Sequence, residues 1–315
     1  MKKPLIILTG PTAVGKTSLS IALAKAVNGE IISADSMQVY RHMDIGSAKI
    51  RPEEMHGVSH HLVDCLEPDE EFNVVRFQQM AKEAMEGIYA RGRIPVLVGG
   101  TGFYIQAVTG DIDFTVHGED TTYRRMLEEK AKTEGAQVLH EMLAAVDPAS
   151  AEVIHANNVK RVIRALEYYQ QTGKPISQHN EEQRQKESPY NLAYFVLDDD
   201  RSRLYERIDA RIDQMLDEGL IDEVKALKEM GYHKGMVSMQ GLGYKEILSY
   251  LDGTWSLEEA VYVLKRDTRH FAKRQITWFK RERQVERFDK QEFGYDSQAI
   301  LDAMLASLRE KKIIE

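Results

Sequence analysis

The segment Gly10–Thr17 has the residue types and the spacing of a phosphate-binding loop. It matches the pattern G-x-x-x-x-G-K-[ST], and its residues are Gly10, Pro11, Thr12, Ala13, Val14, Gly15, Lys16 and Thr17. Such a loop curls so that successive N–H groups point at one anion, and a following helix adds its positive N-terminal end. Lys16 supplies a charge for the terminal phosphate, and the hydroxyl of Thr17 is a ligand for Mg²⁺. The pattern predicts a polyphosphate site with Mg²⁺ as its cofactor, and by itself it does not decide which bond breaks.

A carboxylate follows the next apolar run of the chain. Residues 31–34 read as a strand, and Asp35 comes directly after them. Ligands bind at the carboxyl edge of a parallel sheet, so we expect Asp35 near the loop; the alternative is a turn or a helix N-cap. The apolar run 94–98 ends in Gly99-Gly100-Thr101, without the aspartate that holds the metal in many phosphoryl-transfer enzymes. Asp35 is therefore expected to be the only carboxylate that ends a strand.

Three arginines are spaced four residues apart. Arg203, Arg207 and Arg211 would share one face of a helix. Planar, multi-donor cations suit a clamp on a leaving pyrophosphate. The alternative is ordinary surface pairing with the acidic residues of the same segment, Glu206, Asp209 and Asp213.

A strongly basic stretch occupies residues 265–287. It holds nine positive and three negative residues within a chain of net charge −8, and His270, Phe271, Trp278 and Phe279 are interleaved. Basic residues beside aromatic rings suit RNA phosphates and unpaired bases. A solvated helix whose aromatic residues face the core has the same composition, so both interpretations stay open. A smaller patch contains Lys160, Arg161 and Arg164.

Apolar runs alternate with helical patterns along most of the chain. Strands are predicted at residues 5–9, 31–34, 94–98 and 192–197, and helices at 18–27, 72–90, 203–215, 221–230, 257–279 and 299–312. This order predicts an α/β fold with a doubly wound parallel sheet. Residues 119–186 are charged, helical and poor in strand signals. We therefore predict a discontinuous core of residues 1–117 and 190–315, with a helical insertion domain at 118–189.

The composition is that of a globular protein. Of 315 residues, 43% are hydrophobic and 29% are charged, which excludes a chain that is disordered throughout. A single cysteine cannot form an intramolecular disulfide, and no apolar run approaches the ~20 residues of a membrane span. We expect a cytoplasmic monomer without a membrane partner.

Taken together, these segments resemble the bacterial tRNA dimethylallyltransferases, also called tRNA isopentenyltransferases. The matching stretches run in the family's order over nearly the whole chain, at residues 10–17, 32–40, 43–49, 98–104, 160–167, 219–224, 241–246 and 272–279. The phosphate loop is shared with many enzymes. Its combination with Asp35-Ser36-Met37-Gln38 and Gly99-Gly100-Thr101 is far more specific.

The resemblance implies a P-loop NTPase-like fold and a reaction. Dimethylallyl diphosphate donates its five-carbon group to N6 of the adenosine 3′-adjacent to the tRNA anticodon (position 37), and diphosphate leaves. The loop holds the diphosphate with Mg²⁺ at Thr17, Asp35 is the general base, and Thr101 lies near the reacting base. Arg207 and Arg211 are candidates for the leaving-group clamp, and the choice between them stays open.

The implied partner is the tRNA anticodon stem-loop, contacted by both the core and the insertion domain. The residues expected to contact it are Asp35, Ser36, Met37, Gln38, Thr101, Arg124, Lys160, Arg161, Arg164, Gln240, Gly243, Tyr244, Lys245, Lys273 and Arg274.

Three other functions share parts of this pattern. An ATP-dependent small-molecule kinase would use the loop, but it would not need the basic stretch and would have a further metal aspartate. A prenyltransferase acting on free adenine nucleotides would share the active site without the basic surfaces. A non-catalytic RNA-binding module would not need an intact Lys16, Thr17 and Asp35. Nucleotide binding, including ATP, to the loop would not by itself establish ATP use.

Overall fold

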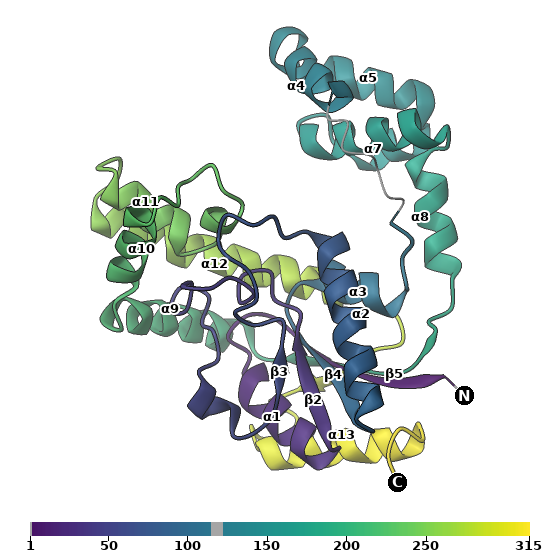
Figure 1. The fold of residues 1–315 in the computed structure, drawn as a ribbon, viewed down its shortest axis with the longest axis vertical. Coiled ribbons are helices and arrows are strands. Elements are labelled where there is room, and N and C mark those ends of the chain that lie inside the picture. Colours follow the sequence, from purple (N-terminus) through teal and green to yellow (C-terminus); the bar gives the residue numbers. More distant parts are fainter. Residues whose placement is uncertain (1, 115–121) are drawn as a thin grey trace. The chain divides into compact units, whose positions relative to one another are not determined.

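The computed structural model describes residues 2–114 and 122–315, and its centre is one parallel sheet (Figure 1). Six strands lie in the order β3-β2-β4-β1-β5-β6, and every neighbouring pair is parallel. Their bounds are β1 Lys3–Thr9, β2 Gly29–Ser33, β3 His60–His61, β4 Ile94–Gly99, β5 Tyr190–Asp198 and β6 Glu286–Asp289. The predicted α/β fold with a parallel sheet is confirmed. The sequence did not predict β3 and β6, which are too short for an apolar period to register.

Helices cover both faces of this sheet. Helix α1 (Lys16–Ala26) follows β1, and α2 (Val74–Ala90) and α3 (Gly102–Thr109) flank β4. The chain moves from β1 across the sheet to β2 and then back to β4. Because parallel crossovers are right-handed, this reversal places α1 and α2 on opposite faces. The C-terminal helix α13 (Ser297–Glu310) packs on α1, and α3 packs on α2.

Four further helices lie between β5 and β6. They are α9 (Arg201–Asp217), α10 (Leu220–Glu229), α11 (Tyr244–Leu251) and α12 (Leu257–Phe279). Helix α12 has the predicted bounds, because Ser256 caps its first turn and Glu259 completes the capping box. The sequence did not predict α11, which has only eight residues. Two short 3₁₀ turns lie at Pro52–Met55 and Ser238–Gln240.

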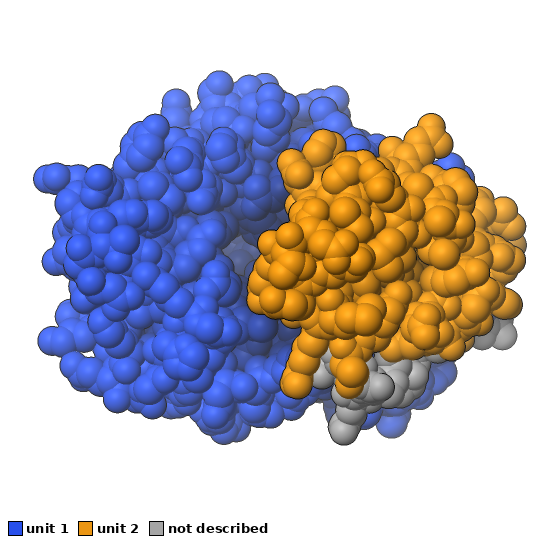
Figure 2. All heavy atoms as spheres, turned by 90° about the horizontal axis from the view of Figure 1, so that it is seen from above, with its two compact units in different colours: residues 1–109, 188–315 blue, residues 110–187 orange. Residues whose placement is uncertain are grey.

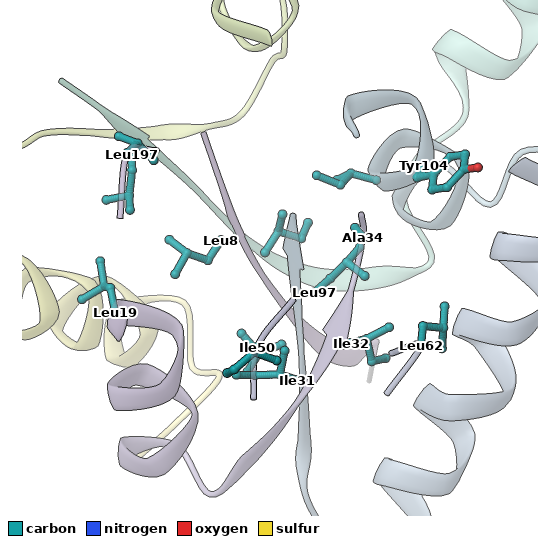
Figure 3. Close-up of a cluster of buried hydrophobic side chains, with 14 of the residues drawn as sticks. Leu8, Leu19, Ile31, Ile32, Ala34, Ile50, Leu62, Leu97, Tyr104 and Leu197 are labelled. Atoms are coloured by element: carbon teal, nitrogen blue, oxygen red, sulfur yellow. The ribbon is translucent and has the colours of Figure 1, made fainter. Parts of the chain in front are cut away.

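The core lies on both sides of the central strands. Leu5, Ile6, Ile7 and Leu8 of β1 are all fully buried, as expected for a strand covered on both faces. Figure 3 shows Leu8, Ile32 and Leu97 from three strands within one cluster of buried side chains. This packing fixes the strand ends and therefore the loops that leave the carboxyl edge.

The chain divides into two compact units, which Figure 2 shows in different colours. Unit 1 comprises Met1–Thr109 with Ser188–Glu315, and unit 2 comprises Gly110–Glu187. Unit 2 is helical, with α4 Thr122–Glu134, α5 Ala136–Val146, α6 Pro148–Val153, α7 Val159–Thr172 and α8 Ile176–Gln185, and it has its own buried cluster. The predicted insertion of 118–189 has its first boundary outside the described residues, and unit 2 ends two residues before the predicted second boundary. Within the described chain, no helix is both long enough and apolar enough to cross a membrane.

One carboxylate of α10 holds the loop that follows β2. Glu223 accepts hydrogen bonds from the backbone N–H groups of Asp44, Ile45 and Gly46 at 3.0, 2.7 and 3.1 Å. It also accepts one from the hydroxyl of Tyr244 at 2.8 Å. A Cβ on Gly46 would lie 2.6 Å from Cζ of Tyr244, so the loop approaches the ring at a distance that only glycine allows.

Replacing Glu223 with alanine leaves these four donors without their shared acceptor. We expect Glu223→Ala to lower the free energy of unfolding by about 2–3 kcal/mol and Tyr244→Phe by about 1 kcal/mol. Urea unfolding followed by circular dichroism measures both. Glu229→Ala, an exposed site on the same helix, is the control. Equal losses for Glu223→Ala and Glu229→Ala would contradict this role.

Candidate active site at the phosphate loop

The predicted phosphate loop connects β1 to α1 at the carboxyl edge of the sheet. Gly15 caps α1 with a φ of +99°, and Gly10 has a φ of +148°. A Cβ on Gly10 would lie 2.5 Å from the carbonyl oxygen of Leu197, at the end of the neighbouring strand β5. Both positions thus require glycine for their positive φ, and Gly10 also for its close approach to the backbone of β5. The loop delivers the unpaired N–H groups of the first turn of α1 to this edge.

Lys16 folds back over the loop. Its ammonium donates hydrogen bonds to the carbonyl oxygens of Gly10 and Pro11 at 2.9 and 2.7 Å. Burial lowers the pKa of Lys16 to about 8, while the nearby Asp35 carboxylate raises it and Arg211 lowers it further. The charges of Asp35 and Arg211 therefore lie close enough to Lys16 to change its pKa.

Asp35 and Thr101 leave adjacent strands at this edge. The Thr101 N–H donates to the carbonyl oxygen of Ala34 at 3.3 Å, and β2 pairs with β4. Oδ1 of Asp35 accepts hydrogen bonds from the N–H groups of Met37 at 2.8 Å and Gln38 at 3.4 Å. Within residues 2–114 and 122–315, Oδ2 of Asp35 has no hydrogen-bond partner. The carboxylate is therefore held by one oxygen, and the other can accept a proton.

The acidic and the basic side chains of α9 have different surroundings. Asp209 accepts hydrogen bonds from Nη1 of Arg269 at 2.6 and 2.7 Å, and Asp213 lies 2.5 Å from Nζ of Lys265, both on α12. These carboxylates are therefore used in packing α9 against α12. Among the described residues, Arg207 and Arg211 have no ion-pair partner, so the alternative of surface pairing within α9 is wrong for them.

The two arginines lie at different parts of the site. A Cβ on Gly15 would lie 3.6 Å from Nη2 of Arg207, so that guanidinium is at the start of α1. Burial lowers the pKa of Arg211, and the Asp35 carboxylate raises it. Arg207 is thus beside the phosphate loop, and Arg211 is within the electrostatic reach of the carboxylate.

Gln275 of α12 connects the loop to the neighbouring strand end. Its side chain is buried, Oε1 accepts a hydrogen bond from the N–H of Thr12 at 2.8 Å, and Nε2 donates to the carbonyl oxygen of Gly100 at 3.0 Å. A Cβ on Gly100 would collide with Nε2 of Gln275. The sequence pattern indicated no role for Gln275, although an amide among the apolar positions of a helix is a usable signal.

Comparison with known proteins agrees with this geometry. The family model described as IPP transferase matches residues 38–282, and the model described as isopentenyl transferase matches residues 3–66. The tRNA dimethylallyltransferase of Lachnoclostridium phytofermentans is 66% identical over 99% of this chain and 100% of its own length. This chain belongs to the IPP transferase family. It is a transferase, and its parallel sheet is the P-loop NTPase-like fold of that family.

Other relatives support the assignment. The tRNA dimethylallyltransferase of Carboxydothermus hydrogenoformans is 52% identical over 92% of this chain and 93% of its own length. The crystal structure of the full-length tRNA isopentenylpyrophosphate transferase of Bacillus halodurans is 47% identical, with a TM-score of 0.74 over 99% of this chain and 98% of that one. A eukaryotic dimethylallyltransferase, solved acting on tRNA, is 32% identical with a TM-score of 0.79 over 91% of this chain and 74% of that one.

The expectation that Asp35 is the only carboxylate ending a strand is wrong for this IPP transferase. Strand β5 runs to Asp198, one residue beyond its predicted end, and Asp199 follows it. Asp199 is 7% exposed, and its Oδ2 has no hydrogen-bond partner among the described residues. The next residue, Asp200, caps α9 by accepting a hydrogen bond from the N–H of Arg203 at 3.0 Å.

The residues expected to contact tRNA have different surroundings in unit 1. Ser36, Met37 and Gln38 are half-buried, Gln240 is exposed, and the buried Gly243 precedes α11. Tyr244 is buried with its hydroxyl on Glu223, and Nζ of Lys245 lies 3.4 Å from Glu246. Lys273 and Arg274 are exposed on α12 without an ion pair among described residues.

Four basic residues of unit 2 were also expected to contact tRNA. Lys160 and Arg161 are exposed at the start of α7, and Arg164 is half-buried. Arg124 of α4 donates to both carboxylate oxygens of Glu167 at 2.9 and 2.8 Å. Within unit 2, Arg124 therefore joins α4 to α7, and a contact with tRNA stays a prediction for all four basic residues.

Removing the Gln275 side chain tests its hold on the loop. We expect Gln275→Ala to raise the dissociation constant for Mg²⁺-pyrophosphate about tenfold, because the N–H of Thr12 loses its fixed partner. Isothermal titration calorimetry gives this constant directly. Thr277→Ala, exposed on the same helix, is the control, and identical constants for the two variants would refute the role.

The pKa of Lys16 predicts how anion binding depends on pH. Below about pH 8 the ammonium is charged in the free protein, and above it the proton is lost, so pyrophosphate affinity is expected to fall as pH rises from 7.5 to 9.5. Pyrophosphate itself gains negative charge over this range, which would act in the opposite direction. Calorimetry at each pH measures the trend for wild type and for Lys16→Arg, which keeps its charge over this range. Because both proteins meet the same pyrophosphate ionisation, we expect the affinity of wild type to fall relative to that of Lys16→Arg, and the same pH dependence in both would contradict the assignment.

Proposed function

We propose that this protein transfers a dimethylallyl group from dimethylallyl diphosphate to N6 of the adenosine 3′-adjacent to the anticodon of tRNA, position 37, and releases diphosphate. The proposal is carried by one observation. A phosphate loop and a half-buried carboxylate meet at one edge of the sheet. There the Asp35 carboxylate raises the pKa of both Lys16 and Arg211. Membership of the IPP transferase family and the similarity to tRNA dimethylallyltransferases support the same reaction.

The Asp35 carboxylate suits the attacking amine, and the phosphate loop suits the leaving diphosphate. The N6 nitrogen forms a bond to the allylic carbon, and the carbon–oxygen bond to diphosphate breaks with its electron pair leaving on oxygen. The amine proton passes to Oδ2 of Asp35, while Oδ1 stays bound to the N–H of Met37. Thr101, one strand away, lies at the same edge and would face the reacting base.

The leaving group needs cations that bind it more tightly as charge develops. Lys16 would exchange the carbonyl oxygens of Gly10 and Pro11 for phosphate oxygens. Arg207 is the better candidate for the clamp, because its guanidinium lies at the start of α1. Arg211 would remain near the Asp35 carboxylate, which raises the pKa of that guanidinium.

The loop also fits the expected Mg²⁺. Among the described residues, no group of three or more His, Cys, Asp or Glu side chains is arranged around a metal site. Mg²⁺ usually keeps several waters and binds through substrate phosphates with one or two protein ligands, so the Thr17 hydroxyl at the start of α1 is a sufficient protein ligand. When bound, the ion would neutralise charge on the leaving diphosphate.

Local basic patches would bind the tRNA, since the whole chain is acidic at −8. Lys273 and Arg274 in unit 1 and Lys160 and Arg161 in unit 2 are exposed, which suits phosphate contacts. Lys265, Arg266 and Arg269 contribute less, because each is paired with a carboxylate. We further propose that the protein works in the cytoplasm as a monomer.

Asp35→Asn tests the proposed function. It keeps a hydrogen-bond acceptor for the N–H of Met37 and removes the base, so kcat is expected to fall about 10²–10⁴-fold while stem-loop RNA binding stays within about twofold. The assay follows allyl-labelled dimethylallyl diphosphate into an unmodified anticodon stem-loop, with Mg²⁺, and Asp302→Asn on α13 is the control.

Parallel acceptors and donors separate the alternatives. Label entering AMP rather than RNA would identify a prenyltransferase acting on free nucleotides. Transfer of phosphate from γ-labelled ATP, without allyl transfer, would identify a kinase. An Asp35→Asn variant with unchanged turnover would contradict the role of the carboxylate.

A further inference from the structure

Lys290 stands at the ligand edge of the sheet, although it is far from the phosphate loop in sequence. It directly follows β6, which pairs in parallel with β5. Its N–H donates to the carbonyl oxygen of Asp198 at 3.1 Å, which fixes its backbone beside the end of β5. The carboxyl ends of parallel strands share one edge, so Lys290 and the loop after β1 lie on the same side.

The side chain of Lys290 reaches the start of α1. Its ammonium donates a hydrogen bond to the carbonyl oxygen of Val14 at 3.2 Å. A Cβ placed on Gly15 would lie 3.5 Å from Nζ of Lys290 and 3.6 Å from Nη2 of Arg207. Two cations from different elements therefore converge on the residue that caps the anion-binding helix.

The charges around Lys290 are mostly of its own sign. Burial and the neighbouring Arg207 and Arg203 lower the pKa of Lys290, and the Asp199 carboxylate raises it. Lys290 has no ion-pair partner within the part of the chain that the structure describes. Its ammonium is therefore held near other cations with only a carbonyl oxygen as acceptor, an arrangement that a multiply charged anion would stabilise.

A tyrosine in the turn after β6 supports this cluster. The guanidinium of Arg203 lies 3.8 Å from the centre of the Tyr295 ring, and Nζ of Lys290 lies 6.0 Å from it. The Tyr295 N–H donates to the carbonyl oxygen of Lys290 at 2.9 Å, which closes the turn. Tyr295 thus holds Arg203 beside its ring, close to Lys290.

We propose that Lys290 is a further diphosphate-binding residue, which exchanges its bond to Val14 for a phosphate oxygen of the donor and of the released diphosphate. With Lys16 and Arg207 it surrounds the start of α1 by cations from three separate segments. The inference rests on the proposed function for the identity of the donor. Binding of pyrophosphate to Lys290 does not depend on that identity.

The test compares Lys290→Met, which keeps the apolar stem and removes the charge, with Lys290→Arg. We expect Lys290→Met to raise both the KM for dimethylallyl diphosphate and the inhibition constant for pyrophosphate about tenfold. The KM for stem-loop RNA should stay unchanged, and Lys290→Arg should recover most of the loss. Lys25→Gln, an exposed site at the far end of α1, controls for the loss of one positive charge.

Calorimetric binding of Mg²⁺-pyrophosphate to the unreacted proteins separates this inference from the proposed function. An about tenfold weaker constant for Lys290→Met supports the inference even if the wild type transfers no allyl group. A constant equal to that of wild type, with only a lower melting temperature, would overturn it and leave Lys290 as a structural tie to the loop. Tighter binding in Lys290→Met would also overturn it, because the lysine would then obstruct the site.

Discussion

Repulsion between cations around the phosphate loop is the constraint on which the rest of this site depends. Lys16, Arg207, Arg211 and Lys290 come from three parts of the chain, and none has an ion-pair partner among the described residues. The Asp35 carboxylate raises the pKa of both Lys16 and Arg211. Such a cluster is costly without an anion, so it requires a rigid frame, and the proposed diphosphate would offset the repulsion.

The frame is built from contacts that lie just outside the site. Glu223 holds the loop at Asp44–Gly46 through three backbone N–H groups, and Gln275 ties the phosphate loop to the end of β4. Asp209 and Asp213 fasten α9 to α12, and among the described residues Arg207 and Arg211 keep no ion-pair partner. Because these two carboxylates pair with α12, they do not neutralise the arginines of the site.

The same edge of the sheet separates two kinds of chemistry. Cations collect at the loop after β1, on the side of β5 and β6, while Asp35 and Thr101 leave β2 and β4 on its other side. A donor diphosphate and an acceptor base would therefore approach from neighbouring strand ends, and their reacting atoms would meet between them. This arrangement needs a parallel sheet, because only parallel strands bring all of these ends to one edge.

The sequence by itself determined the features that depend on neighbouring residues. The phosphate loop is eight consecutive residues, and α12 carries its own capping box and helical period, so both were predicted with their positions. The carboxylate after β2 was likewise visible as the residue that ends an apolar run. These are short-range properties, set by backbone angles and by residues within a turn of each other.

The tertiary structure alone decided which distant side chains meet. Gln275 and Lys290 are more than 250 positions from the loop that they contact, and no local pattern distinguishes Lys290 from other lysines. The partners of Asp209 and Asp213, the short strand β6 and the buried Asp199 followed from packing in the same way. Long flexible side chains choose partners by proximity in space, and that proximity is set by how the whole sheet and its helices pack.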